Sequence, residues 1–237
     1  MQHFGRVTQI MDCGTCPYRT SRMFCNLSPP SLEKFKAIGS NCDVSKGVTL
    51  FREQEACDEI FVLCTGQIKL FCTSKAGKRV ILKVAQPGDV LGLSAMIAGA
   101  RHEATAEAIE SVQFKRVRKA EFNEFLHEHI EASLHASHAL SLESNRALIN
   151  IRRLAVSASA AGKLAAVLLN WGCGASHREG ESRFAMTLTH EELAALAGTS
   201  RETVTRTLRR FQDEQLIQIA GYSIRILSPR GLEELSG

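Results

Sequence analysis

The sequence predicts an α+β protein with a small antiparallel β-roll, then a long helix, then a C-terminal helix-turn-helix with a β-hairpin. Short β-rich runs broken by glycines fill residues 47–117, a helical pattern follows Ala120, and two short capped helices lie near the C-terminus. The shifts in periodicity divide the chain into domains. These are an N-terminal cysteine arm (1–30), a β-roll (31–120), a dimerisation helix (121–156) and a winged helix-turn-helix domain (157–237).

Composition limits the class of protein. The chain has 237 residues, 44% of them hydrophobic, and a formal charge of +4, which is too mild for a polybasic coating that binds any polyanion. No apolar run reaches the ~20 residues that a bilayer span needs, and the N-terminus lacks an apolar signal core. We therefore expect a cytoplasmic protein with no membrane partner. Its eight cysteines are then expected to be thiols or ligands rather than structural disulfides.

The β-roll is predicted from short runs of β-branched and aromatic residues. The runs are 49–51, 60–63, 67–71 and 80–84, and the glycines between and after them are Gly66, Gly77, Gly88 and Gly92. Strands this short with frequent turns indicate a small antiparallel barrel.

The long helix is predicted from apolar residues that recur every four positions, and from the absence of Pro and Gly between Ser111 and Ala161. The stripe consists of Phe122, Leu126, Ile130 and Leu134. Small residues near it would let two helices approach closely: Ala132, Ser133, Ala136, Ser137, Ser141 and Ser144. The pattern favours a homodimer seam. A helix packed on its own barrel is the alternative, and both contacts can hold together.

The helix-turn-helix is predicted from its caps. Thr189 can cap the first helix, with Glu192 three residues on completing a capping box, and Gly198 ends that helix. Ser200 can cap the second helix. Its inward face carries Val204 and Leu208.

The outward face of the second helix is basic and rich in hydrogen-bonding groups: Arg201, Glu202, Thr205, Arg206 and Arg209. Arg201 and Arg206 can each present a fork of donors to O6 and N7 of guanine, and Glu202 can accept from the N4 amine of cytosine. This face is of the kind that enters a DNA major groove. The alternative is a solvated helix whose arginines pair with Glu202 and Asp213.

The run Ser200-Arg201-Glu202-Thr203-Val204-Thr205-Arg206, followed by an alternating hairpin over 217–226, resembles the DNA-binding domain of the Crp/Fnr family of bacterial transcription regulators. The resemblance implies that Arg201, Glu202 and Arg206 read a G-containing half-site. It also implies palindromic double-stranded DNA, RNA polymerase and a second copy of the chain as partners. Thr189, Ser200, Thr205 and Arg209 complete the expected set of DNA-binding residues.

The β-roll is similar to the family's cyclic-nucleotide-binding jelly roll at Lys46-Gly47, 65–69 and 87–92. Family members that bind cyclic AMP place a Glu directly after the glycine at Gly92, and an arginine about ten residues on. Here Leu93 follows Gly92, and Glu103-Ala104-Thr105 lies where the arginine would be. A carboxylate would then meet the phosphate, which argues against cyclic AMP, although Arg101 nearby could rescue binding in an altered loop.

Three cysteines of the arm, Cys13, Cys16 and Cys25, are candidate ligands. Oxygen-sensing Fnr-type members hold a [4Fe-4S] cluster with three cysteines in such an arm and one from the barrel, so the resemblance implies this cofactor. The chain departs from the pattern, because the spacing from Cys16 to Cys25 is longer and the strand expected to carry the fourth cysteine (111–115) has no thiol.

The fourth ligand has several candidates, and Cys64, just before the Thr65-Gly66 turn, is the one we favour. Cys42, Cys57 and Cys72 are the others, and small apolar barrel residues are the expected role for cysteines of this region. A Cys₄ zinc site and a dithiol-disulfide switch between Cys13 and Cys16 are the chemical alternatives to a cluster.

Other functional classes find less support. His135 and His138 could share a helix face and bind metal or haem, but a solvated face explains them as well. A cupin-like metal- or metabolite-binding barrel or enzyme is the alternative function. It needs His-x-His on a strand, whereas His127-Glu128-His129 lies in the helical region. No hydrolase, P-loop or dinucleotide motif occurs. We therefore expect a regulator and no enzyme activity.

Overall fold

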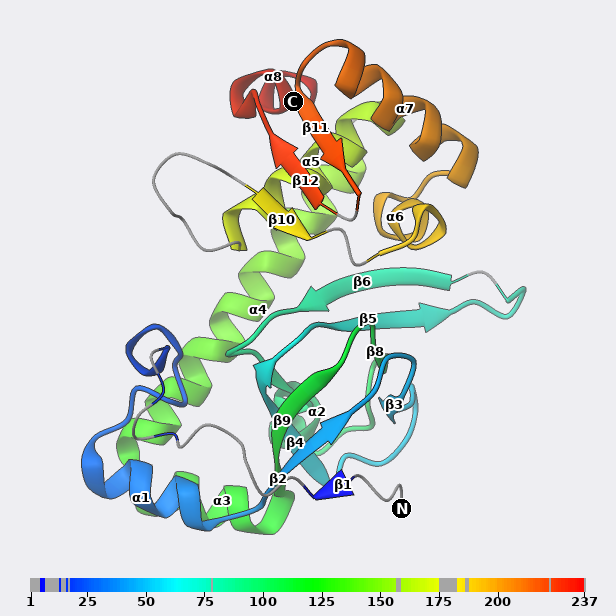
Figure 1. The fold of residues 1–237 in the computed structure, drawn as a ribbon. Helices are drawn as coiled ribbons and strands as arrows, with labels where there is room; N and C mark the ends of the chain where they lie inside the picture. Colours follow the sequence, from blue (N-terminus) through cyan, green and yellow to red (C-terminus); the bar gives the residue numbers. More distant parts are fainter. Residues whose placement is uncertain are drawn as a thin grey trace. The chain divides into compact units, whose positions relative to one another are not determined.

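The computed structural model describes residues 5–6, 13, 16, 18–77, 79–156, 159–174, 183–185, 188–221 and 223–236 (Figure 1). Contacts divide the chain into two compact units. One unit comprises Met1–Cys72 with Leu82–Asn145, and the other comprises Thr73–Ile81 with Arg146–Gly237.

A β-roll of two sheets makes up most of the first unit. One sheet has the order β1 (Gly5–Arg6), β2 (Ser40–Val44), β9 (Val112–Arg118), β4 (Glu59–Thr65), β7 (Val90–Leu91). The other has the order β3 (Thr49–Phe51), β8 (Thr105–Ala108), β5 (Ile68–Thr73), β6 (Arg79–Ala85). The pairs β2–β9, β4–β9 and β5–β8 are antiparallel. The four predicted β-rich runs all lie in strands, which confirms the β-roll.

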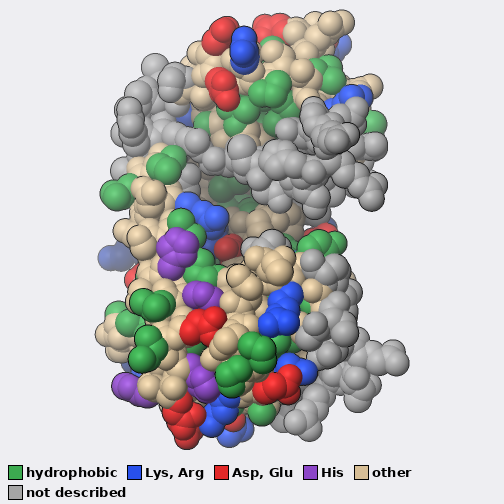
Figure 2. Space-filling model, turned by 90° about the vertical axis from the view of Figure 1, so that its left-hand side faces the viewer, with side chains coloured by type: hydrophobic (Ala, Val, Ile, Leu, Met, Phe, Trp, Pro, Cys, Tyr) green, Lys and Arg blue, Asp and Glu red, His purple; other side chains and the backbone are tan. Residues whose placement is uncertain are grey.

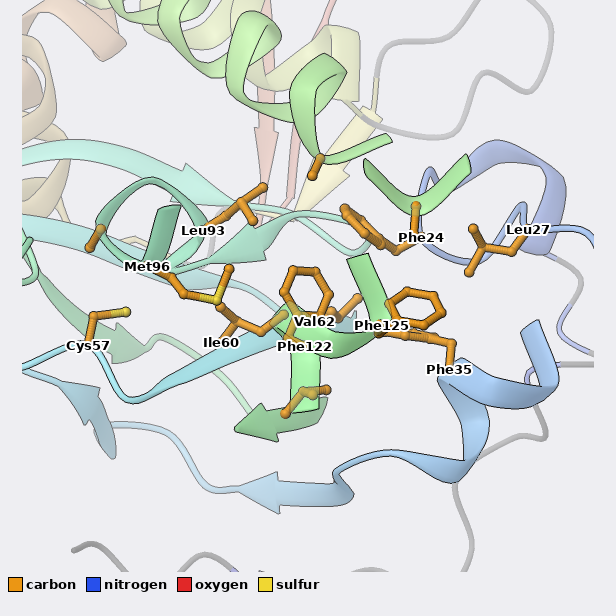
Figure 3. Packing of buried hydrophobic residues seen from close by; sticks show 14 of the residues in the cluster. Phe24, Leu27, Phe35, Cys57, Ile60, Val62, Leu93, Met96, Phe122 and Phe125 are labelled. Carbon is orange, nitrogen blue, oxygen red and sulfur yellow. The ribbon is translucent and has the colours of Figure 1, made fainter. Parts of the chain in front are cut away.

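Helices cover the roll and close a second core beside it. They are the 3-10 turn η1 (Arg19–Ser21), α1 (Pro29–Ala37), α2 (Leu93–Ala98), α3 (Lys119–Glu128) and the start of α4 (Ile130–Val156). Figure 3 shows the aromatic rings of Phe24, Phe35, Phe122 and Phe125 gathered in this core. Their centroids lie 5.4 to 6.2 Å apart.

The predicted single helix is broken at His129, whose backbone is extended (φ −124°, ψ 95°). Two hydrogen bonds flank the break, one near in the chain and one from α1. The Ser133 hydroxyl donates to the Leu126 carbonyl (2.7 Å) near the end of α3, and the Ser31 hydroxyl is hydrogen-bonded to His129 Nδ1 (3.0 Å). The expectation of one continuous apolar stripe is therefore wrong. Phe122 is fully buried, but Ile130 and Leu134 are 77% and 64% exposed.

The second unit contains the predicted helix-turn-helix and hairpin. Its elements are α5 (Ala160–Gly174), β10 (Arg183–Ala185), α6 (His190–Ala197), α7 (Arg201–Asp213), β11 (Ile217–Ala220), β12 (Ser223–Ile226) and α8 (Pro229–Ser236). The predicted strands β11 and β12 pair antiparallel, and β10 adds a third strand that the sequence did not predict. Among the helices described, none is long and apolar enough to cross a membrane.

Two glycines offer a matched test of the β-roll. Gly39 has φ +66°, and a Cβ there would fall on the Arg116 carbonyl oxygen. Gly47 has φ +84° and open space around its Cβ position. We expect Gly39→Ala to lower the free energy of unfolding by about 3–4 kcal/mol, the sum of left-handed strain and overpacking, and Gly47→Ala by about 1–2 kcal/mol from strain alone. Urea titration of both variants, followed by circular dichroism, measures the difference. Equal losses would contradict the close approach at Gly39.

Candidate DNA-reading face and cysteine cluster

The two helices of the helix-turn-helix begin and end as their caps predict. The Thr189 hydroxyl accepts from the Glu192 N–H (3.2 Å), while the Glu192 carboxylate accepts from the Thr189 N–H (2.9 Å). Gly198 ends α6 in the left-handed conformation, and the Ser200 hydroxyl accepts from the Thr203 N–H (3.2 Å). The hydroxyls of Thr189 and Ser200 therefore serve mainly as helix caps, although both residues belong to the predicted DNA-binding set.

One face of α7 is buried and the opposite face is exposed. Val204, Thr207, Leu208 and Phe211 pack inward. The residues of the opposite face line one shallow depression and are all exposed: Arg201, Glu202, Thr205, Arg206 and Arg209. We call these five residues the reading face.

The arginines of the reading face are not paired in the way that the solvated-helix alternative requires. Among the described residues, no ion pair joins Arg201, Arg206 or Arg209 to a carboxylate, and the ion pair on α7 joins Arg210 to Glu214 (3.5 Å). The pKa of Glu202 is lowered by hydrogen bonds from its own backbone and from the Ser200 side chain, and further by the charge of Arg201. The reading face therefore presents guanidinium groups whose donors are available to a nucleic acid.

His190 is a residue of this site that the sequence analysis missed. Its Nδ1 lies 2.9 Å from the Thr205 hydroxyl, across from α6 to α7. Fifteen residues separate the two in the chain, so no local pattern links them.

The cysteine arm folds against the β-roll through two arginines. Arg19 donates to the Leu27 carbonyl (2.8 Å) and closes the turn around Cys25. Arg22 donates to the Cys64 carbonyl (2.9 Å) and lies over the Tyr18 ring, 4.7 Å from its centroid. The Arg22 contact joins the arm to the end of β4, whereas the Arg19 contact lies within the arm.

The four cysteines favoured from the sequence interact with one another, and we call Cys13, Cys16, Cys25 and Cys64 the four-thiol cluster. Burial, then the neighbouring Cys64 and Cys13, raises the pKa of Cys25 to about 12. Burial and the neighbouring Cys13 raise the pKa of Cys64 to about 11. Within the described part of the chain, no three His, Cys, Asp or Glu side chains stand close enough to hold a metal ion as they are.

A buried lysine, also missed from the sequence, lies beside this cluster. Lys115 is 5% exposed, donates to the Lys36 carbonyl (3.2 Å) and lies 5.4 Å from the Phe35 ring centroid. Burial lowers its pKa, while Cys13 and Cys64 oppose that shift. Lys115 lies on β9, which pairs with β4, so Cys64 occupies the strand next to the one expected to carry the fourth cysteine.

Two of the remaining cysteines follow the simpler interpretation, whereas His135 does not lie on the solvated helix face expected from the sequence. Cys42 and Cys57 are buried in the two hydrophobic cores, which confirms their apolar role, and Cys72 is partly exposed on β5. His135 stands edge-on to Phe24, with ring centroids 6.3 Å apart. Its Nδ1 is buried, so the expectation of a solvated face is wrong for His135, and the alternative of a metal site shared with His138 is not found among the described residues.

The residues that would have to bind a cyclic nucleotide make contacts within the protein instead. Leu93 is 2% exposed in the core, and Arg101 donates to the Gln54 carbonyl (2.8 Å). His102 stacks on Phe51 with ring centroids 3.8 Å apart, and burial lowers its pKa.

Comparison with known proteins agrees with this architecture. Residues 162–235 match the family model of the Crp-like helix-turn-helix domain, and residues 42–129 match that of the cyclic nucleotide-binding domain. The nitrogen fixation regulation protein FixK of Bradyrhizobium diazoefficiens is 28% identical over 225 residues, covering 94% of this chain and 93% of FixK. The transcriptional activatory protein AadR of Rhodopseudomonas palustris is 28% identical over 226 residues, covering 93% and 91%.

Solved structures share the fold. FixK2 from Bradyrhizobium japonicum superimposes with a TM-score of 0.77 at 19% identity, covering 84% of this chain and 98% of that chain. These matches place a DNA-binding domain and a sensor-type β-roll on one chain, as in the relatives, and so favour a regulator over a cupin-like barrel. The chain belongs to the Crp/Fnr family of signal-responsive, DNA-binding transcription regulators.

Proposed function

We propose that this regulator works in the cytoplasm as a homodimer on palindromic DNA, and that the four-thiol cluster is its sensor, with a [4Fe-4S] cluster as the bound group. The observation that carries the proposal is that the arm packs on the end of β4, where Arg22 donates to the Cys64 carbonyl (2.9 Å), and that Cys25 and Cys64 there interact with the charges of Cys13 and Cys16. RNA polymerase is the further partner that this role requires.

The donor set fits an iron–sulfur cluster in its chemistry. Four thiols is the number that such a cluster takes, and a bound cluster would supply oxygen-sensitive redox chemistry. Arg22 and Lys115 both interact with these thiols and would offset the negative charge of four thiolates. Burial and the neighbouring thiols raise the pKa of both Cys25 and Cys64, so loading of a cluster must displace their protons.

A signal at the arm has a direct physical route to α4. Phe24, next to Cys25, is buried against Phe122 of α3 and His135 of α4. Glu131 of α4 accepts from the backbone N–H of Ser28 (3.0 Å) and from its hydroxyl (2.8 Å). A shift of the arm would therefore change how α4 packs, and so bias one of two populations of the regulator.

The two faces of α4 have different roles in this proposal. Ala132 and Ala136, expected from the sequence to bring two helices together, are instead buried against the first unit's own core. The exposed apolar residues are the better seam: Ile130, Leu134, Leu142, Leu148 and Ile149. Hydrophobic side chains and histidines are visible together on the lower part of the face in Figure 2. A second copy would remove these side chains from water.

The cofactor is tested by anaerobic purification, with iron, zinc and sulfide analysis and a visible spectrum before and after exposure to air. We expect about four iron and four sulfide per chain and a colour that air bleaches. Cys64→Ser should retain less than about a tenth of the iron, because four thiolates are required, whereas the control Cys72→Ser should load normally. Zinc without sulfide would mean that the thiols bind zinc and not an iron–sulfur cluster. A colourless, metal-free protein would overturn the proposal and leave the Cys13–Cys16 dithiol as the sensor.

Base reading is tested at Arg201. We expect Arg201→Ala to weaken binding to the preferred operator by about 1–3 kcal/mol and to relax base preference at one position, because a bidentate contact to guanine is lost. Fluorescence anisotropy on operator variants measures both effects. An equal loss on all sequences would instead make Arg201 a phosphate contact.

The dimer seam is tested at Leu134. Placing a carboxylate there with Leu134→Asp should raise the dimer dissociation constant more than about tenfold, since each copy would lose the burial of one large apolar side chain. Sedimentation equilibrium measures this constant. The matched control is Leu227→Asp, which changes an exposed leucine outside α4 and should leave the dimer intact. A dimer equally stable in both variants would place the seam elsewhere.

A further inference from the structure

The exposed side of α4 follows a seven-residue repeat that its apolar residues alone do not reveal. Leu134, Ser141 and Leu148 are spaced seven residues apart, and His138 and Asn145 fall between them, so that the steps alternate between four and three residues. All five side chains are exposed in this chain. Alternating steps of four and three mark the a and d positions of a two-stranded coiled coil, which face the partner helix.

The other side of α4 is already in use, which leaves the repeat for a second copy of the chain. Ala132 and Ala136 are buried in the core of the first unit, and Ala139 and Leu140 pack against that core. None of these four residues belongs to the repeat. A partner helix can therefore lie along the repeat without displacing α4 from its own domain.

The middle of this repeat is polar, because His138, Ser141 and Asn145 stand between the two leucines. Polar residues at such positions weaken a coiled coil but fix its register, because a shifted pairing would bury them against apolar side chains. In a parallel, two-fold pair, each a residue faces the same residue of the other copy. His138 then meets His138 of the second copy, and Asn145 meets Asn145.

Two imidazoles that face each other tolerate some protonation states and not others. When both are neutral, or when only one is charged, an N–H of one ring can donate to the free nitrogen of the other. When both are charged, each ring has only donors, and two positive charges face each other in the seam. An imidazole changes its charge between about pH 5 and pH 8, so this last state is reached on mild acidification.

The carboxylates nearest to His138 along α4 are held by other partners. Glu131 accepts from the Ser28 hydroxyl (2.8 Å), and Glu143 pairs with Lys83 of β6 (3.7 Å). Among the described residues, no ion pair joins His138 to a carboxylate. A second positive charge at the seam would therefore stay uncompensated.

The basic groups near His138 do not relieve this repulsion. His135, one turn before it, stands edge-on to Phe24, with its Nδ1 buried. Arg146, about two turns after it, carries a further positive charge. The cost of the doubly charged state thus falls on the contact between the two copies.

We propose that two copies pair in register along residues 134–148, and that the His138 pair makes this dimer sensitive to pH. The proposal rests on the homodimer given above, and it adds the register of the seam and a signal separate from the four-thiol cluster. Pairing disfavours the doubly charged state, so the separated copies bind more protons than the pair does. The dimer therefore weakens as the pH falls.

The test measures the dimer dissociation constant of the full, anaerobically purified chain at pH 7.5 and at pH 5.5, by sedimentation equilibrium. We expect the constant to rise about fivefold at the lower pH, because the dimer loses access to the doubly protonated state. The iron content is recorded at both pH values, so that loss of a bound cluster is not mistaken for the effect of His138.

Variants assign the effect to one side chain. His138→Asn keeps a polar group but removes the charge, so its dissociation constant should be the same at both pH values. His138→Lys keeps a charge throughout this range, so its dimer should be weak at both. The matched control is His127→Asn, which changes an exposed histidine of α3 and should keep the wild-type pH dependence.

Two results would overturn the inference while leaving the homodimer intact. They are a wild-type dissociation constant that does not change between the two pH values, and a His138→Asn variant that keeps the wild-type pH dependence. A chain that stays monomeric at both pH values would be a different result, because it would refute the homodimer itself and this inference with it.

Discussion

The arrangement of the first unit depends on the packing of Phe24, which joins the cysteine arm to the β-roll and to α4. Its ring is 1% exposed and contacts Phe35, Phe122 and His135, which come from α1, α3 and α4. A buried phenylalanine is worth about 3–5 kcal/mol, more than any surface ion pair here can supply. Because Cys25 is the next residue, the four-thiol cluster cannot change its geometry without disturbing this contact. The proposed sensor is therefore packed directly on the core of the first unit.

The break at His129 determines how α4 can be used. A continuous helix would have aligned Phe122, Leu126, Ile130 and Leu134 on one stripe, and all four would have competed for the same core. Ending α3 at Glu128 lets α4 start in a new direction, with Ala132 and Ala136 against the roll and Ile130 and Leu134 in solvent. Small residues on the inner side permit a close approach to the roll, and large apolar residues remain on the outside. One helix thereby has a buried face for its own domain and an exposed apolar face, which is the proposed dimer seam.

In the second unit, capping and the proposed base reading are divided among different polar residues. Thr189, Glu192 and Ser200 satisfy backbone N–H groups at the helix starts, so the reading face does not have to. Val204, Leu208 and Phe211 hold α7 from behind. Arg201, Arg206 and Arg209 are then left without carboxylate partners among the described residues. Unpaired charge on a rigid helix costs little in water and becomes favourable only against a polyanion.

The sequence by itself determined the elements whose causes are local: the capped helices, the hairpin around Gly221, the short strands, and the outward face of α7, because capping, turn chemistry and side-chain periodicity act over a few residues. It also indicated Cys64 as the partner of the arm, although only as a preference among several thiols. Tertiary structure decided the rest. The bend at His129 depends on Ser31 of α1, the place of Lys115 depends on the pairing of β4 with β9, and the contact of His190 with Thr205 depends on α6 packing against α7. These contacts join residues distant in the chain, and no local periodicity encodes such distances.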